Sequence, residues 1–153
     1  MNALAKLLSV FIGDKRELLY AYTFSQIGKR KCFRCPIEFG CADSVNTLYK
    51  ECFGNEIGGD VSTLRLYNAL YRSIKFTEVR LPQVLKGDII ISPTSMGNGS
   101  MPNGHVGVVG ENGVIISNNS ATGLLDTHIT IDTWIKKYGV GGGFPILFYR
   151  TLI

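Results

Sequence analysis

The sequence predicts an α+β domain in which N-terminal helices pack on a central antiparallel sheet. Apolar residues recur at helical spacing through the first half of the chain, up to about residue 73. Beyond that point, short runs rich in β-branched residues alternate with glycine-containing turns, which is the pattern of strands. Two of these runs, residues 105–110 and 114–119, are joined through an Asn-Gly pair, and this predicts an antiparallel hairpin.

Length and composition indicate one folded domain over residues 1–153. Of the 153 residues, 45% are hydrophobic and 18% are charged, so neither disorder nor a fibrous repeat is expected. The net charge of +4 is scattered, without the basic arm or aromatic platform of a nucleic-acid-binding protein. The charge suits an anionic surface such as a bacterial wall, and nucleic acid is not an expected partner.

The first twelve residues predict a core-packing helix. Leu4, Leu7, Leu8 and Phe11 lie at helical spacing, and the apolar stretch is too short to insert into and span a membrane. The stretch carries only Lys6 as a positive charge and has no small-residue cleavage site, so a signal peptide is not expected. We expect synthesis in a cytoplasm, where thiols stay reduced.

The four cysteines favour chemistry or packing over a disulfide framework. Cys32 and Cys35 have the spacing of half a zinc site, but no second pair at ligand spacing exists. We expect two ordinary thiols or a local bridge at these positions, and no metal or other cofactor. Cys52 falls within an apolar helical stripe and is expected to be a packed, inert thiol.

The first half of the chain also predicts a second helix and a loop. Asp14 is placed to cap a helix that runs to about Ile27, and Gly28 should end it. Residues 29–40 contain Pro36 and predict a loop that leads into Cys41.

Two more helices follow this loop. From Cys41 onward, apolar and polar residues separate onto opposite faces until Gly54, which predicts an amphipathic helix. Ser62 is placed to cap a further helix that reaches about Ser73.

The second half predicts strands, one loop and one short helix. Residues 76–81 are expected to be extended, and residues 89–92 read as a buried strand. The glycine-rich residues 93–104 predict a mobile loop. In the tail, Asp132 is a candidate cap for a short helix, and the remaining features are an extended run at 129–131, a flexible turn at 139–143 and a last strand at 144–153.

Cys41 and His105 are the candidate nucleophile and base. At the first turn of a helix, unpaired N–H groups and the helix dipole favour a thiolate, and the N–H of Cys41 is a candidate oxyanion donor. His105 begins the predicted hairpin, and Ser117, Asn118 and Asn119 end it. One of these three polar side chains is therefore expected beside the imidazole, where Asn118 would fix the tautomer of the ring.

Four motifs follow one another between Gly40 and Asn119: Gly-Cys-Ala-x-x-Val, Lys-Gly-Asp-Ile-Ile-Ile-Ser, Gly-His-Val-Gly-Val-Val-Gly and Ile-Ser-Asn-Asn-Ser. This ordered set resembles the NlpC/P60 and CHAP superfamily of papain-like cysteine peptidoglycan hydrolases. The resemblance implies a papain-like fold with Cys41 as the nucleophile and His105 as the base. It places the third catalytic residue at the end of the second hairpin arm.

The sequence departs from the NlpC/P60 pattern around the nucleophile and at the third position. Gly-Cys-Ala-Asp-Ser replaces the frequent Asp-Cys-Ser-Gly-Phe and resembles a branch with a final asparagine, which favours Asn118. When the hairpin is aligned on its Asn-Gly turn with the branch whose third catalytic residue is a second histidine, the third position falls on Ser117 instead. Asp43 would oppose a nearby thiolate and is expected to point away from it. The second oxyanion donor is unassigned, because no upstream glutamine takes the position known from papain.

The resemblance implies cleavage of an amide bond in the stem peptide of bacterial peptidoglycan. The enzyme would be an endopeptidase or an N-acetylmuramoyl-L-alanine amidase. Because neither a wall-binding repeat nor a signal peptide is recognised in the sequence, we expect a monomeric, antimicrobial phage endolysin, made in the host cytoplasm and acting in the periplasm or cell wall. The alternatives are a secreted interbacterial amidase effector of the same fold, acyl transfer to an acceptor other than water, and a catalytically inert virion or wall-binding module.

Overall fold

The computed structural model describes residue 3 and residues 14–152, and these form a six-stranded antiparallel sheet with helices on both faces. The strands follow the spatial order β1-β6-β2-β3-β4-β5. The predicted α+β class with a central antiparallel sheet is therefore confirmed. The strands are β1 (Phe76–Val79), β2 (Ile89–Ser92), β3 (His105–Val109), β4 (Val114–Asn118), β5 (Leu125–Thr130) and β6 (Leu147–Thr151).

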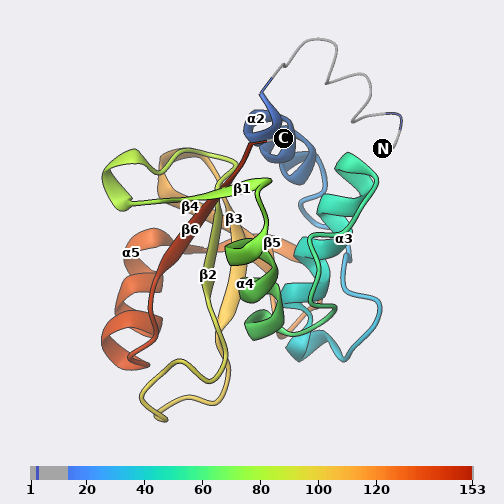
Figure 1. Cartoon of the computed structure of the whole chain (residues 1–153). Coiled ribbons are helices and arrows are strands. Elements are labelled where there is room, and N and C mark those ends of the chain that lie inside the picture. Colours follow the sequence, from blue (N-terminus) through green and yellow to red (C-terminus); the bar gives the residue numbers. More distant parts are fainter. Residues whose placement is uncertain (1–2, 4–13, 153) are drawn as a thin grey trace.

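Three helices cover one face of the sheet, and a shorter helical segment covers the other (Figure 1). The first group is α2 (Lys15–Ser25), α3 (Cys41–Phe53) and α4 (Thr63–Arg72). The segment on the opposite face is α5 (Ile131–Trp134), which continues as a π-helix over Ile135–Gly141. Across the described part of the chain, no helix has both the length and the apolar character needed to cross a bilayer.

The ends of the three N-terminal helices agree with the sequence signals. Asp14 accepts a hydrogen bond from the N–H of Arg16 at 2.8 Å, and Ser62 accepts one from the N–H of Arg65 at 3.2 Å. Gly54 ends α3 with φ of 93°, a left-handed conformation that glycine adopts without steric cost. The predicted caps Asp14, Ser62 and Gly54 are confirmed, whereas α2 ends at Ser25 with Gln26 as its C-cap, before the end predicted at Ile27 and Gly28.

The central strand β2 is buried on both sides, as its run of isoleucines predicts. Ile89 and Ile91 pack into the core formed with α2, α3 and α4, whereas Ile90 packs into a second core with Trp134 and Tyr138. The sheet is thus the middle layer of three.

The tail differs from its prediction. Thr130, not Asp132, caps α5, because Thr130 and Thr133 exchange side-chain and backbone hydrogen bonds in a capping box. Residues 139–141, predicted as part of a flexible turn, belong to the π-helix. Of the extended run predicted at 129–131, residues 129 and 130 end a longer strand, β5, which starts at Leu125, whereas Ile131 begins α5.

The loop between β2 and β3 is tied down despite its glycine-rich composition. The N–H of Asn98 donates to the carbonyl of Gly142 at 2.7 Å, and Ser100 Oγ donates to the carbonyl of Gly141 at 2.8 Å. These contacts join two segments that lie about forty residues apart in the chain. The helix predicted from Leu4 to Phe11 lies outside the described residues.

The register of the hairpin decides which side chains accompany His105. Val109 pairs with Ile115, and the N–H of Gly110 bonds to the carbonyl of Val114 at 2.6 Å, so the loop has three residues, 111–113. Successive side chains of a strand point to opposite faces. With this pairing, Ser117 shares the face of His105, and Asn118 faces α3.

Candidate active site

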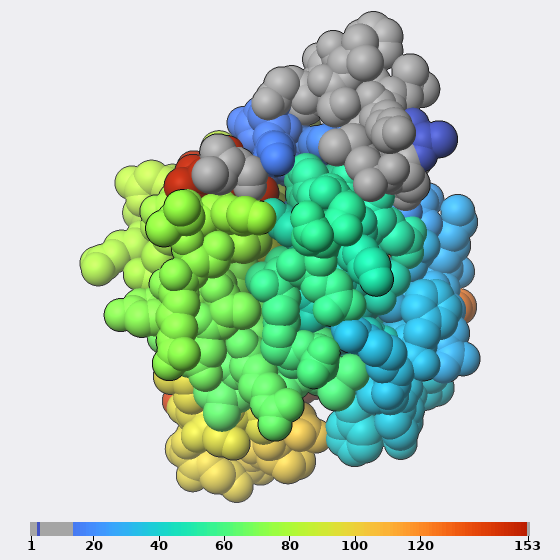
Figure 2. Space-filling model, turned by 45° about the vertical axis from the view of Figure 1, so that its right-hand side comes forward, coloured from blue at the N-terminus to red at the C-terminus, as the bar shows by residue number. Residues whose placement is uncertain are grey.

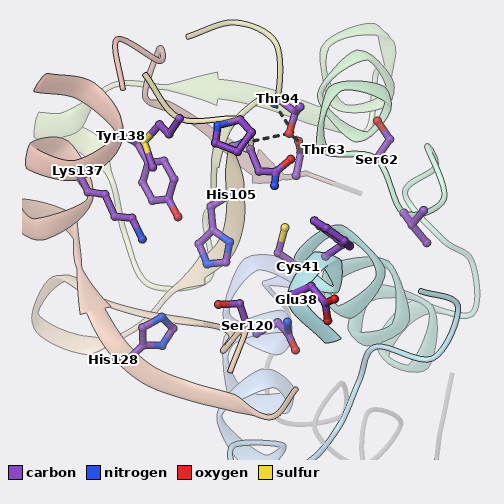
Figure 3. Close-up of a pocket in the computed structure, with 17 residues that line it drawn as sticks. Glu38, Cys41, Ser62, Thr63, Thr94, His105, Ser120, His128, Lys137 and Tyr138 are labelled. Atoms are coloured by element: carbon purple, nitrogen blue, oxygen red, sulfur yellow. Dashed lines mark hydrogen bonds between the residues drawn. The ribbon is translucent and has the colours of Figure 1, made fainter. Parts of the chain in front are cut away.

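Cys41 and His105 line one open cleft of about 430 Å³ at one end of the molecule. Cys41 is the first residue of α3, and His105 is the first residue of β3. Figure 3 shows both side chains directed into the same space. Figure 2 shows that the segment leading into α3 and the β2–β3 loop, both of which contribute to the lining, come together at this end.

Close packing under Gly40 positions the nucleophile candidate. A Cβ on Gly40 would lie 2.5 Å from Cys32 Cβ and 3.1 Å from Asn118 Nδ2, so no larger residue fits without displacement. Asn118 Nδ2 also donates to the carbonyl of Ile37 at 2.9 Å. These contacts hold the loop that delivers Cys41 to the cleft.

Asp43 anchors the same loop from within the first turn of α3. Its fully buried carboxylate accepts hydrogen bonds from the N–H groups of Phe33 at 2.6 Å and Arg34 at 2.9 Å, and from Arg34 Nε at 2.6 Å. Burial alone would raise the pKa of Asp43, but these donors and the guanidinium lower it overall. The carboxylate is therefore directed at the loop and not at the thiol, as expected.

The imidazole of His105 is held by one hydrogen bond and two aromatic rings. Its Nε2 lies 3.1 Å from Ser117 Oγ. The ring stacks on Trp134 with centroids 5.0 Å apart and on Tyr138 with centroids 5.8 Å apart. Trp134 is itself fixed, since its Nε1 donates to Ser92 Oγ at 2.9 Å. With Nε2 engaged, Nδ1 is the ring nitrogen left for the thiol.

The Cys41 thiol and the His105 imidazole are both uncharged in the free protein at neutral pH. Burial raises the pKa of Cys41 to about 11, although the N–H groups of Val106, Ala42 and Cys41 itself favour the thiolate. Burial and then the positive charges of His128 and Lys137 lower the pKa of His105 to about 3. The proton therefore stays on sulfur in the free protein.

The contact predicted for Asn118 is made by Ser117. The Asn118 side chain lines the cleft, but it faces α3, and its buried Oδ1 has no hydrogen-bond partner among the described atoms. Asn119 Nδ2 donates to Asp126 Oδ2 at 2.8 Å. Of the three polar residues that end the hairpin, only Ser117 is hydrogen-bonded to the imidazole in the described structure. The catalytic roles themselves stay predictions.

Several residues of the cleft belong to none of the motifs recognised in the sequence. His128 and Lys137 line the wall on the His105 side, and Thr63 and Thr94 line another part of the cleft. Thr63 Oγ1 and Thr94 Oγ1 are 2.8 Å apart, and Thr94 Oγ1 accepts from the N–H of Gly104 at 3.0 Å. Only the folded arrangement of distant segments brings these side chains together.

The described residues contain no disulfide and no metal-binding cluster. All four cysteines are free thiols, and Cys52 is fully buried in the core. Among the described residues, no cluster of three or more histidine, cysteine, aspartate or glutamate side chains is arranged to hold a metal ion.

The arrangement defines an α+β domain with a cysteine–histidine cleft, and comparison with solved structures identifies its fold. Over 92% of its length the chain is similar to NlpC1 from Trichomonas vaginalis, with 16% identity and a TM-score of 0.58. It is equally similar to NlpC2 from the same organism, with 14% identity, 92% coverage and a TM-score of 0.58. The chain spans only 45% and 47% of those two proteins. No protein-family model and no curated protein matches the sequence. The fold is thus of the NlpC/P60 type, which confirms the sequence resemblance at the level of the fold.

Proposed function

We propose that the protein is a cysteine peptidase or amidase that cleaves an amide bond in the stem peptide of peptidoglycan. The observation that carries the proposal is the meeting of Cys41 and His105, from different elements, in one cleft, with Ser117 bonded to Nε2 of the imidazole. A thiol, a neutral base and a group that orients the base are the set that nucleophilic catalysis by cysteine requires.

In the proposed reaction, His105 Nδ1 takes the proton of Cys41 as the sulfur attacks the amide carbonyl carbon. The negative charge moves to the carbonyl oxygen, which the N–H of Cys41 at the start of α3 stabilises. Collapse of this intermediate breaks the C–N bond, and the imidazolium gives its proton to the departing amine. Water, with His105 as base, then hydrolyses the thioester and restores the thiol.

The substrate and setting are supported by the ordered motifs of the sequence and by the fold. We assign the substrate as bacterial peptidoglycan, the form as a monomer, and the place of action as the periplasm or cell wall, where that polymer lies. The biological role that we favour is that of a phage endolysin, with an interbacterial amidase effector as the alternative. Orientation of the imidazole is assigned to Ser117 in place of Asn118.

The test is release of new amines from purified bacterial walls. Wild-type protein is expected to release them, Cys41→Ala is expected to release none, and mass spectrometry of the fragments identifies the bond. Cys35→Ser is the matched control, because the Cys35 thiol contacts the carbonyl of Phe39 outside the proposed chemistry and a hydroxyl preserves that contact. Full activity of Cys41→Ala would overturn the assignment, and an inactive wild-type protein that still binds walls would favour an inert binding module.

A further inference from the structure

The two walls of the cleft carry opposite charges. Glu38 lies beside Cys41 on the wall formed by the segment that precedes α3. Lys137 and His128 lie on the wall of His105, and Figure 3 shows the Lys137 chain extending toward the space between the two histidines. A substrate that enters the cleft therefore meets a negative charge near the nucleophile and positive charge near the base.

Lys137 is free to bind an anion. Its Nζ lies 5.2 Å from the centroid of the Tyr138 ring, and its side chain has no carboxylate partner within the residues that the structure describes. The side chain is exposed at the cleft, so binding of an anion needs little desolvation.

His128 is a second polar group on this wall, and its ring is held in a fixed orientation. Its Nδ1 is hydrogen-bonded to Asp126 Oδ1, and Asp126 Oδ2 accepts from Asn119 Nδ2 at 2.8 Å. Within the described residues only Nδ1 of this ring is hydrogen-bonded, so Nε2 is left to donate to a ligand when the ring is protonated. The Asn119–Asp126–His128 series thus fixes the ring at the edge of the cleft.

The proposed chemistry decides which half of the substrate lies against this wall. The departing amine receives its proton from His105, so the amine half must lie on the His105 side. The acyl half stays with Cys41 on the opposite side, near Glu38. Lys137 and His128 therefore face the half of the substrate that leaves.

We propose that Lys137, assisted by His128, forms a carboxylate subsite for the leaving half of the substrate. The inference rests on the proposed function and names its substrate class: amides whose amine fragment carries a free carboxylate, in preference to the same amides with that carboxylate amidated. The positive charges of Lys137 and His128 oppose protonation of His105. A carboxylate bound between them offsets that effect, so binding of the correct substrate also favours the proton transfer.

The test compares two synthetic stem peptides that differ only in whether the carboxylate of the leaving half is free or amidated. Wild-type kcat/KM is expected to be about two- to fivefold higher for the free acid, the range of an exposed ion pair. Lys137→Met should remove this preference, and high salt should reduce it. Lys136→Met is the control, since Lys136 is exposed on the same helical segment and does not line the cleft.

An NMR titration of the Cys41→Ala protein with the same two peptides measures their affinities without hydrolysis, and so tests the subsite apart from the reaction. Tighter binding of the free acid that disappears in the Cys41→Ala/Lys137→Met double variant supports the subsite. This conclusion holds even when wild type hydrolyses neither peptide, because that failure would overturn only the proposed function. Hydrolysis by wild type with equal kcat/KM and equal affinity for both peptides would overturn the subsite and leave the proposed function standing.

Discussion

Replacement of Ser117 by alanine should slow the reaction more than replacement of Asn118. Ser117 Oγ is the only group that the described residues place at hydrogen-bonding distance from Nε2 of His105. Its loss leaves a polar atom of a largely enclosed ring without a partner, which costs about 1–3 kcal/mol. If the whole cost falls on the transition state, where the ring carries a proton, kcat/KM falls by about 5- to 150-fold.

Asn118→Ala should act mainly on stability. The substitution removes the hydrogen bond to the carbonyl of Ile37, but it also removes a buried oxygen that has no partner. These two effects oppose each other, so we expect a net loss of about 1 kcal/mol or less in the free energy of unfolding. The effect on kcat/KM should stay below about fivefold, because the Asn118 side chain is bonded to Ile37 and not to the imidazole.

The assay measures kcat/KM for both variants on one soluble stem peptide, with thermal unfolding as a check of folding. Nitrogen NMR of the ring adds a reading that a purely structural effect would not change. Loss of the Ser117 hydroxyl should alter the tautomer of His105, whereas Asn118→Ala should leave it as in wild type. A folded Asn118→Ala protein with the larger loss of kcat/KM would refute the assignment of Ser117.

Three further predictions concern the surroundings of the nucleophile. Asp43→Asn should lower the free energy of unfolding at pH 7 by about 2–4 kcal/mol, because it removes a buried charge that accepts three hydrogen bonds. Since the folded state lowers the pKa of Asp43, this contribution is present above the ordinary aspartate value and fades as pH falls below about 4, so urea unfolding at two pH values should show a narrowing gap. Gly40→Ala should cost about 1–3 kcal/mol, because its Cβ would meet Cys32 at 2.5 Å, and an unchanged unfolding midpoint would contradict this packing. In a Cys35→Ser background, alkylation of Cys41 should accelerate up to about pH 11, and a plateau at neutral pH would instead indicate a resting thiolate.

The sequence carried enough information for the fold class and for the two principal candidates at the site. Caps, helical periodicity and β-branched runs are local signals, and they correctly predicted α2, α3, α4 and β2. The start of α5 was misjudged because Thr130 and Asp132 are both good capping residues, and only the bond between Thr130 and Thr133 distinguishes them. His128 and Lys137 lack any local signal, since they reach the cleft through tertiary contacts alone.

The hairpin register explains why Ser117, and not the predicted Asn118, is bonded to the imidazole. A two-residue Asn112–Gly113 turn would pair residue 111 with 114, and Asn118 would then share the face of His105. The loop has three residues, so Gly110 pairs with Val114 and every side chain of β4 changes face. A shift of one residue therefore decides the third position, and both loop lengths suit the same Asn-Gly sequence.

A serine at this position fits the electrostatics of the cleft. A carboxylate partner would stabilise the imidazolium before any substrate is bound, whereas a hydroxyl is neutral and can either donate to Nε2 or accept from it. Burial and the charges of His128 and Lys137 keep His105 neutral in the free protein. Stabilisation of the imidazolium is then left to the stacked rings of Trp134 and Tyr138 and to a carboxylate brought by the substrate. On this reasoning Ser117→Asp should bring a negative charge into the resting site and raise the pKa of His105. It should also weaken the preference of the enzyme for a free carboxylate on the leaving half of the substrate. A raised pKa of His105 with an unchanged preference would show that the subsite does not act through protonation of the base.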